Sequence, residues 1–109
     1  MSKANLIKIK SLIQDFENVQ KKYSDAGTWD TEPSFKFQLA LKKAIVNKKN
    51  IIPKNDLPEW WELYIGEKNV NKAAVELTET ANIIVNEVIE NSDSISIRDY
   101  LVERYCWRV

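Results

Sequence analysis

The sequence has no histidine, one cysteine and two glycines, and these shortages exclude most familiar catalytic sites. Histidine is the commonest general base, the usual partner of a serine or cysteine nucleophile, and the usual zinc ligand. Cys106 alone forms neither an internal disulfide nor a cysteine metal cluster. Gly27 and Gly66 are too few and too far apart for a glycine-rich phosphate loop. We therefore expect a protein that is not an enzyme and that holds no metal or cofactor.

Long hydrophobic runs are also absent, because no uninterrupted apolar stretch exceeds three residues, as in residues 83–85. A membrane-spanning helix needs about 20 apolar residues, and a signal peptide needs about 7–15. We expect neither, and therefore predict no membrane partner and a cytoplasmic location. A single cysteine agrees with a reducing compartment. Its neighbours Tyr105 and Trp107 favour a buried or half-buried thiol at Cys106.

The chain of 109 residues, with 44% hydrophobic and 29% charged residues, fits one globular domain. Scarce glycine disfavours closely spaced strand turns, whereas apolar residues recur at helical spacing along most of the chain. We predict a single all-α domain over residues 1–109. Its fold is expected to be a compact bundle of about five helices with uncertain ends, at approximately residues 3–25, 33–48, 57–65, 69–90 and 97–106.

The helix expected at residues 33–48 carries two apolar stripes. One stripe contains Phe37 and Leu41, and the other contains Leu39 and Val46. Because a helix with two apolar stripes buries two sides, this pattern predicts a central position in the bundle.

The start of the last helix is predicted from local capping signals. Ser96 and Asp99 have the spacing of a capping box, and Ile95 and Tyr100 have the spacing of a hydrophobic staple. We therefore expect Ser96 to be the N-cap, after a connecting loop at residues 91–94.

Charge is distributed unevenly along the chain, although its net value is zero. Residues 1–54 contain eleven lysines and five acidic residues, a net charge of +6. Residues 55–109 contain five basic and eleven acidic residues, a net charge of −6. The two halves either neutralise one another within the fold or present faces of opposite sign, and we favour the first interpretation.

The most informative surface pattern lies on the helix expected at residues 69–90. Ile83 falls on its outward face among four carboxylates at helical spacing, namely Glu76, Glu79, Glu87 and Glu90. An aliphatic residue framed by carboxylates predicts contact with a basic partner that has an apolar hollow. Alternatively, Ile83 packs under a neighbouring segment or is simply one exposed apolar residue.

Adjacent tryptophans give a second candidate contact region. Trp60 and Trp61 point about 100° apart on a helix, so one of them, or Tyr64, is expected at the surface. Aromatic residues are favoured interface anchors, although most of those in a small domain are buried. We include Trp60, Trp61 and Tyr64 among the candidate partner-binding residues.

These features favour a stoichiometric inhibitor or immunity protein that neutralises a bacterial toxin or nuclease through its acidic helix face. The alternative is a small helical subunit of a larger complex, one that could include nucleic acid, using the lysine-rich N-terminal half. The lysines concerned cluster at Lys42, Lys43, Lys48, Lys49 and Lys54. The cluster contains no arginine, which argues against base reading. A self-associating regulator is a third hypothesis.

Overall fold

The computed structural model describes residues 3–23, 32–54 and 70–107, and the side chains of residues 5–20, 36–54 and 75–107 among them. These ranges form the helices α1 (Lys3–Tyr23), α2 (Glu32–Asn47), α4 (Val70–Glu90) and α5 (Ile95–Tyr105), without any strand between them. The all-α prediction is confirmed. The helix expected at residues 57–65, with Trp60, Trp61 and Tyr64, lies outside the described residues.

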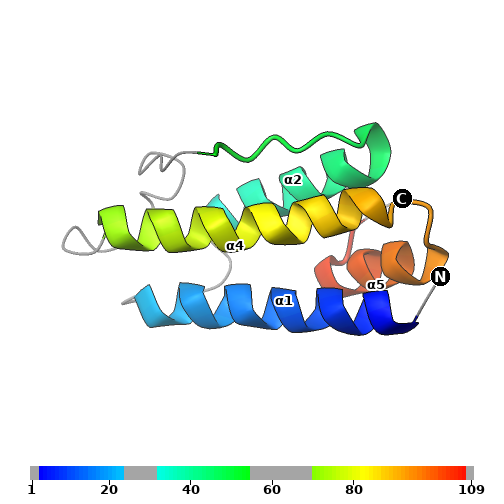
Figure 1. Ribbon diagram of the computed structural model, residues 1–109, viewed down its shortest axis with the longest axis horizontal. Coiled ribbons are helices and arrows are strands. Elements are labelled where there is room, and N and C mark those ends of the chain that lie inside the picture. Colours follow the sequence, from blue (N-terminus) through cyan, green and yellow to red (C-terminus); the bar gives the residue numbers. More distant parts are fainter. Residues whose placement is uncertain (1–2, 24–31, 55–69, 108–109) are drawn as a thin grey trace.

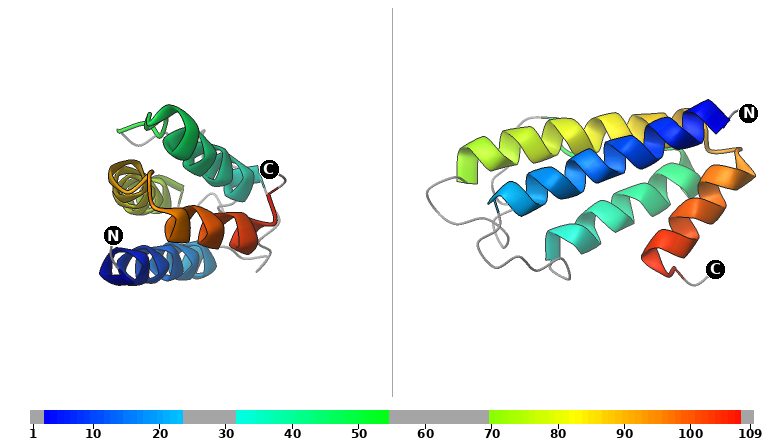
Figure 2. Two further views of the ribbon diagram at one scale, coloured as in Figure 1. Left: turned by 90° about the vertical axis from the view of Figure 1, so that its right-hand side faces the viewer. Right: turned by 90° about the horizontal axis from the view of Figure 1, so that it is seen from below.

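α4 is the helix against which both α1 and α2 pack. Figure 1 shows α1 and α4 side by side and antiparallel, with α5 near the end of the bundle where α1 begins. The end-on view in Figure 2 shows α1, α2 and α4 around a common interior, with α5 crossing in front of it. Each helix therefore has one face toward the interior and one face turned outward.

The interior is a single apolar core supplied by all four helices. Its largest buried side chains recur at helical spacing along α1 and α4, as the sequence predicts. Phe16 of α1 stacks on Phe37 of α2, with ring centroids 4.1 Å apart and an interplanar angle of 24°. The fully buried large side chains are Phe16, Phe37, Ile9, Ile13, Leu41, Leu77, Ile84, Ile97, Leu101, Val85 and Val88.

The predicted central position of α2 is wrong for the part of the helix whose side chains are described. Phe37 and Leu41 are buried, but Leu39 is 48% exposed and Val46 is 75% exposed. The physical reason is that α4 takes the place between its neighbours, which leaves α2 only one face to bury. α2 ends at Asn47, and Lys48 follows with a positive φ of 54°, which turns the chain back.

The predicted start of α5 is also wrong, because the N-cap is Ser94 and not Ser96. Ser94 has an extended backbone (φ −78°, ψ 116°), and its Oγ accepts a hydrogen bond from the Ile97 amide at 3.3 Å. The helix begins at Ile95, and its buried residues are Ile97 and Leu101. The bond from the Ile97 amide to Ser94 Oγ starts the helix two residues earlier than the capping-box pattern predicts.

This cap assignment predicts that Ser94→Ala lowers the free energy of unfolding by about 1 kcal/mol, because the Ile97 amide loses its acceptor. Urea denaturation followed by circular dichroism measures the change. Ser96→Ala is the matched control, since Ser96 is exposed inside the helix and alanine has the higher helix propensity. Equal losses in the two variants would contradict the assignment.

The C-terminal end of α5 corrects the expectation of a buried thiol. Cys106 is exposed and adopts the left-handed conformation (φ 53°) that caps the helix. This turn brings Trp107 back onto the core, where its indole Nε1 donates to Gln38 Oε1 at 3.1 Å. Trp107 is therefore a packing residue and its neighbour Cys106 faces solvent.

Candidate protein-binding site

The outward face of α4 presents Ile83 as the sequence predicts. The Ile83 side chain is 51% exposed, whereas Ile84 and Val85 beside it are fully buried. Glu79 and Glu90 are exposed and form no ion pair with the described residues. We call Glu79, Ile83 and Glu90 the acidic ridge.

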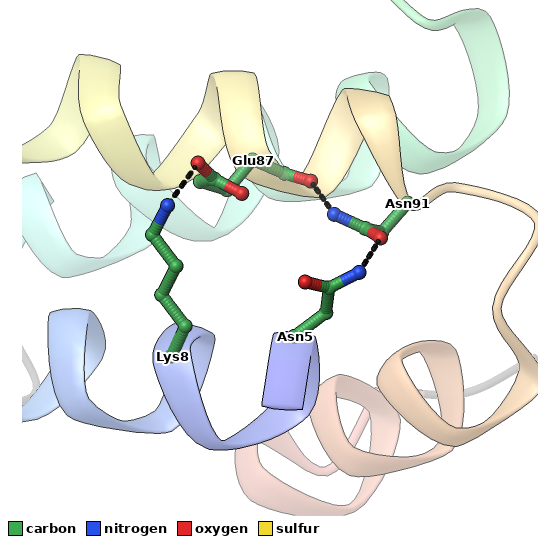
Figure 3. Close-up of polar contacts among 4 residues, drawn as sticks. All are labelled: Asn5, Lys8, Glu87 and Asn91. Carbon is green, nitrogen blue, oxygen red and sulfur yellow. Dashed lines mark hydrogen bonds and ion pairs between the residues drawn. The ribbon is translucent and has the colours of Figure 1, made fainter. Parts of the chain in front are cut away.

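The remaining two predicted glutamates of this face are half-buried. The carboxylate of Glu87 is paired within the molecule, because Lys8 Nζ of α1 lies 2.8 Å from Glu87 Oε1 (Figure 3). Hydrogen bonding to Glu87, and then its charge, raises the pKa of Lys8. Glu87 therefore marks the border of the face toward α1 and is less available to a partner than the acidic ridge.

Two asparagines extend this border to the end of the helix pair. Asn5 Nδ2 donates to Asn91 Oδ1 at 2.8 Å, and Asn91 Nδ2 donates to the Glu87 carbonyl at 2.8 Å. Figure 3 shows Asn5 and Lys8 reaching from α1 toward Asn91 and Glu87. These contacts fix α4 against α1 beside the face that carries Ile83.

The uneven distribution of charge along the sequence is partly neutralised within the fold. Lys8 pairs with Glu87, and Lys48 Nζ lies 3.8 Å from Asp93 Oδ1, so each pair joins a lysine of the first half to an acid of the second. A third pair, Arg104 with Glu17, joins α5 to α1. In this pair the basic residue comes from the second half of the chain and the acidic residue from the first. These pairs support the first interpretation of the charge pattern without using the carboxylates of Glu79 and Glu90.

On the side opposite to α1, residues 50–54 run back alongside α4 (Figure 1). The segment and the helix enclose an open groove of about 740 Å³. Glu79 and Ile83 of the acidic ridge form part of its wall. The other lining residues are Asn50, Ile52, Lys54, Asn82 and Asn86. Ile83 therefore lies in the wall of this groove and is 51% exposed.

Three asparagines hold this segment in place, and we call them the asparagine clamp: Asn50, Asn82 and Asn86. Asn50 Nδ2 donates to Asn82 Oδ1 at 2.6 Å and to Asn86 Oδ1 at 3.0 Å. Asn82 Nδ2 donates in turn to the carbonyls of Pro53 at 3.1 Å and Thr78 at 3.0 Å. The clamp fixes the wall of the groove beside Ile83.

The asparagine clamp is not among the features that the sequence patterns predict. The available signal was the spacing of Asn82 and Asn86, which are four residues apart and therefore on one side of the helix. Two amide oxygens at this spacing can accept hydrogen bonds from one side-chain amide of a neighbouring segment, as Asn82 and Asn86 do from Asn50.

A second polar and aromatic cluster joins α5 to α1 and α2. Tyr105 stacks on Trp107 with ring centroids 5.5 Å apart, and Lys42 Nζ lies 5.2 Å from the Trp107 centroid. Burial raises the pKa of the Tyr105 phenol. Its position against the core indicates a packing role, because its neighbours Arg104 and Glu17 are already paired with one another.

Within the described ranges, no three side chains of the metal-ligating acidic or sulfur type gather closely enough to hold an ion. None of the described helices is both long and apolar enough to span a bilayer. Comparison of the chain with protein-family models, curated proteins and solved structures finds no match.

Proposed function

We propose that this protein is a non-catalytic protein-binding domain that works as a stoichiometric inhibitor or immunity protein. Its partner is a basic protein, such as a bacterial toxin or nuclease, and its binding surface is the acidic ridge on α4. The observation that carries the proposal is Ile83, 51% exposed between the exposed carboxylates of Glu79 and Glu90. An apolar side chain inside a charged frame has the layout of a protein interface.

The support beneath the acidic ridge suits it for tight binding. α4 is held by the Lys8–Glu87 pair on one side and by the asparagine clamp on the other. Its inner face is anchored by fully buried side chains such as Ile84 and Val88. A surface that is already ordered loses little conformational entropy when a partner docks, so more of the contact energy contributes to affinity.

The chemistry of the acidic ridge fits a cleft that normally holds phosphate. Carboxylates attract lysine and arginine side chains and accelerate encounter with a basic surface. Ile83 then supplies the apolar contact from which water is excluded. Occupation of such a cleft by the helix would block a polyanionic substrate without any reaction on the inhibitor.

The proposal predicts that Ile83→Asp combined with Glu79→Lys lowers the affinity for the partner by about 30-fold or more, since loss of an anchor residue costs at least ~2 kcal/mol. The partner is first identified by pulldown from the native host with mass spectrometry. Affinity is then measured by calorimetric titration. The melting temperature should change by only a few degrees, because both side chains are exposed.

A matched control makes the same two changes elsewhere on the surface. Ile95→Asp with Glu103→Lys alters an exposed isoleucine and an exposed glutamate on α5, where Ile95 is 72% exposed. This variant should bind the partner as the natural sequence does. Unchanged affinity of the α4 variant, or equal losses in both, would contradict the assignment of the acidic ridge.

The alternative function, a subunit that contacts nucleic acid, draws on the exposed lysines of α2 and the following segment. Lys42, Lys43, Lys49 and Lys54 are all exposed. Fluorescence anisotropy with generic DNA and RNA at low salt tests it, because phosphate contacts are strongest there. Absence of binding under those conditions removes this alternative.

A further inference from the structure

The outward face of α2 carries apolar residues that the core does not use. Leu39 is 48% exposed and Val46 is 75% exposed. They are seven residues apart and therefore lie on one line along the helix. Lys42 and Lys43 are exposed on either side of that line. We call these four residues the lysine face.

The lysine face and the acidic ridge both combine exposed apolar side chains with exposed charges, and their charges are of opposite sign. On α2, Lys43 lies one turn after Leu39, and Val46 lies two turns after it. On α4, carboxylates stand at these distances on the two sides of Ile83, at Glu79 and Glu90. The two faces therefore offer apolar side chains to one another together with charges of complementary sign.

These two faces cannot meet within one molecule. α2 and α4 pack on one another and on the core through their inner sides, where Leu41 and Val85 are fully buried. Their exposed residues consequently point away from the shared interior. Contact between the faces requires two molecules.

We infer that the lysine face of α2 binds the acidic ridge of a second copy of this chain. The inference goes beyond the proposed function, which concerns α4 and a different protein. A copy of the chain fits better than nucleic acid, because Leu39 and Val46 occupy the middle of the face. Those side chains would lie against a polyanion with nothing apolar to cover them, whereas Ile83 of a second copy covers them.

The contact joins two different surfaces, so it is heterologous. Each pair leaves one lysine face and one acidic ridge free, and further copies add until the ends meet or the concentration limits growth. One helix lying on another buries an area at the small end of specific interfaces, so the association is weak and reversible. Because the participating charges are exposed, salt weakens it.

This association also bears on the acidic ridge itself. A second copy and the basic partner would occupy the same residues, Glu79, Ile83 and Glu90. The partner therefore displaces copies of the chain when it binds, and the free protein keeps its apolar contact residues covered at high concentration.

Sedimentation velocity of the full chain tests the inference at concentrations up to the order of 1 mM, which suffices for a weak contact. We expect the weight-average mass to rise with concentration at low salt and to return to the monomer value in about 1 M salt, where the screening length is ~3 Å. Monomer at every concentration overturns the inference.

Two blocked variants then identify the surfaces. Leu39→Asp disables the lysine face and Ile83→Asp disables the acidic ridge, and both sites are exposed in the fold. Each variant alone should remain monomeric. An equimolar mixture should form dimers and nothing larger, because each variant keeps one intact face. A mixture that stays monomeric while the natural sequence associates overturns the assignment.

Charge reversal provides a second test that does not depend on apolar substitutions. Lys43→Glu or Glu79→Lys alone should weaken association at least tenfold, and the two changes together in one chain should restore it. Failure of the double variant to recover overturns the inference. The Leu39→Asp variant should still bind the basic partner, so loss of self-association and loss of the proposed function are measured separately.

Discussion

Replacing Phe16 by alanine is expected to lower the free energy of unfolding by about 3–5 kcal/mol. Phe16 is 1% exposed and stacks on Phe37 at a centroid distance of 4.1 Å, so the change leaves a cavity between α1 and α2. Domains of this size are stable by only about 5–15 kcal/mol. Urea denaturation monitored by circular dichroism measures the loss from the shift of the midpoint at constant slope.

The matched control is Ile7→Ala on the same helix, because Ile7 is 65% exposed. Its effect should stay within about 0.5 kcal/mol. Phe37→Ala and the double variant complete a cycle that isolates the ring contact, expected at about 0.5–1.5 kcal/mol. A loss below about 1 kcal/mol for Phe16→Ala would show that the two rings do not join α1 to α2 in a well-packed core.

After Phe16→Ala, removing the centre of the asparagine clamp is expected to cause the second-largest loss in the free energy of unfolding. Asn82 makes three hydrogen bonds through its side chain, to Asn50 and to the carbonyls of Pro53 and Thr78. Each contributes about 0.5–1.5 kcal/mol, so Asn82→Ala should lower the free energy of unfolding by about 2–3 kcal/mol. Denaturant titration measures this loss.

Amide hydrogen exchange shows which part of the structure loses stability in the Asn82→Ala variant. The amide of Ile52 donates to Asn50 Oδ1 at 2.8 Å, and its protection should fall when Asn82 no longer holds Asn50. Asn86→Ala is the control, because Asn86 accepts one bond from Asn50 and is itself exposed. Its cost should be about 0.5–1 kcal/mol. Equal costs at both positions would exclude Asn82 as the central residue of the clamp.

Helical periodicity predicted the parts of the fold that depend on one helix at a time. The apolar arcs of α1 and α4 contain the residues that are buried, such as Ile13 and Ile84, because a continuous stripe can be covered only by the core. The helical periodicity of α4 also predicts that Ile83 lies on the outward side, and this prediction needs no information about the segments packed beside the helix. These results follow from the 3.6-residue period alone.

The parts that periodicity could not predict depend on contacts between distant segments. Asn50 and Asn82 are 32 residues apart, and Lys8 and Glu87 are 79 residues apart, so no local pattern pairs them. Packing between the helices puts α4, not α2, in the central position, so the second apolar stripe of α2 stays exposed. At α5, Ser94 and Ser96 both satisfy local capping rules, and it is Ser94 whose Oγ accepts the hydrogen bond from the Ile97 amide.

The packing of α1 on α4 also sets the order in which the chain can fold as it is made. The apolar stripe of α1 leaves the ribosome first, but α4 ends only at Glu90. At about 5–20 residues per second, the first helix waits several seconds for its cover. During that time Ile9, Ile13 and Phe16 have no native partner on α4, so this apolar stripe stays open to aggregation until α4 has emerged.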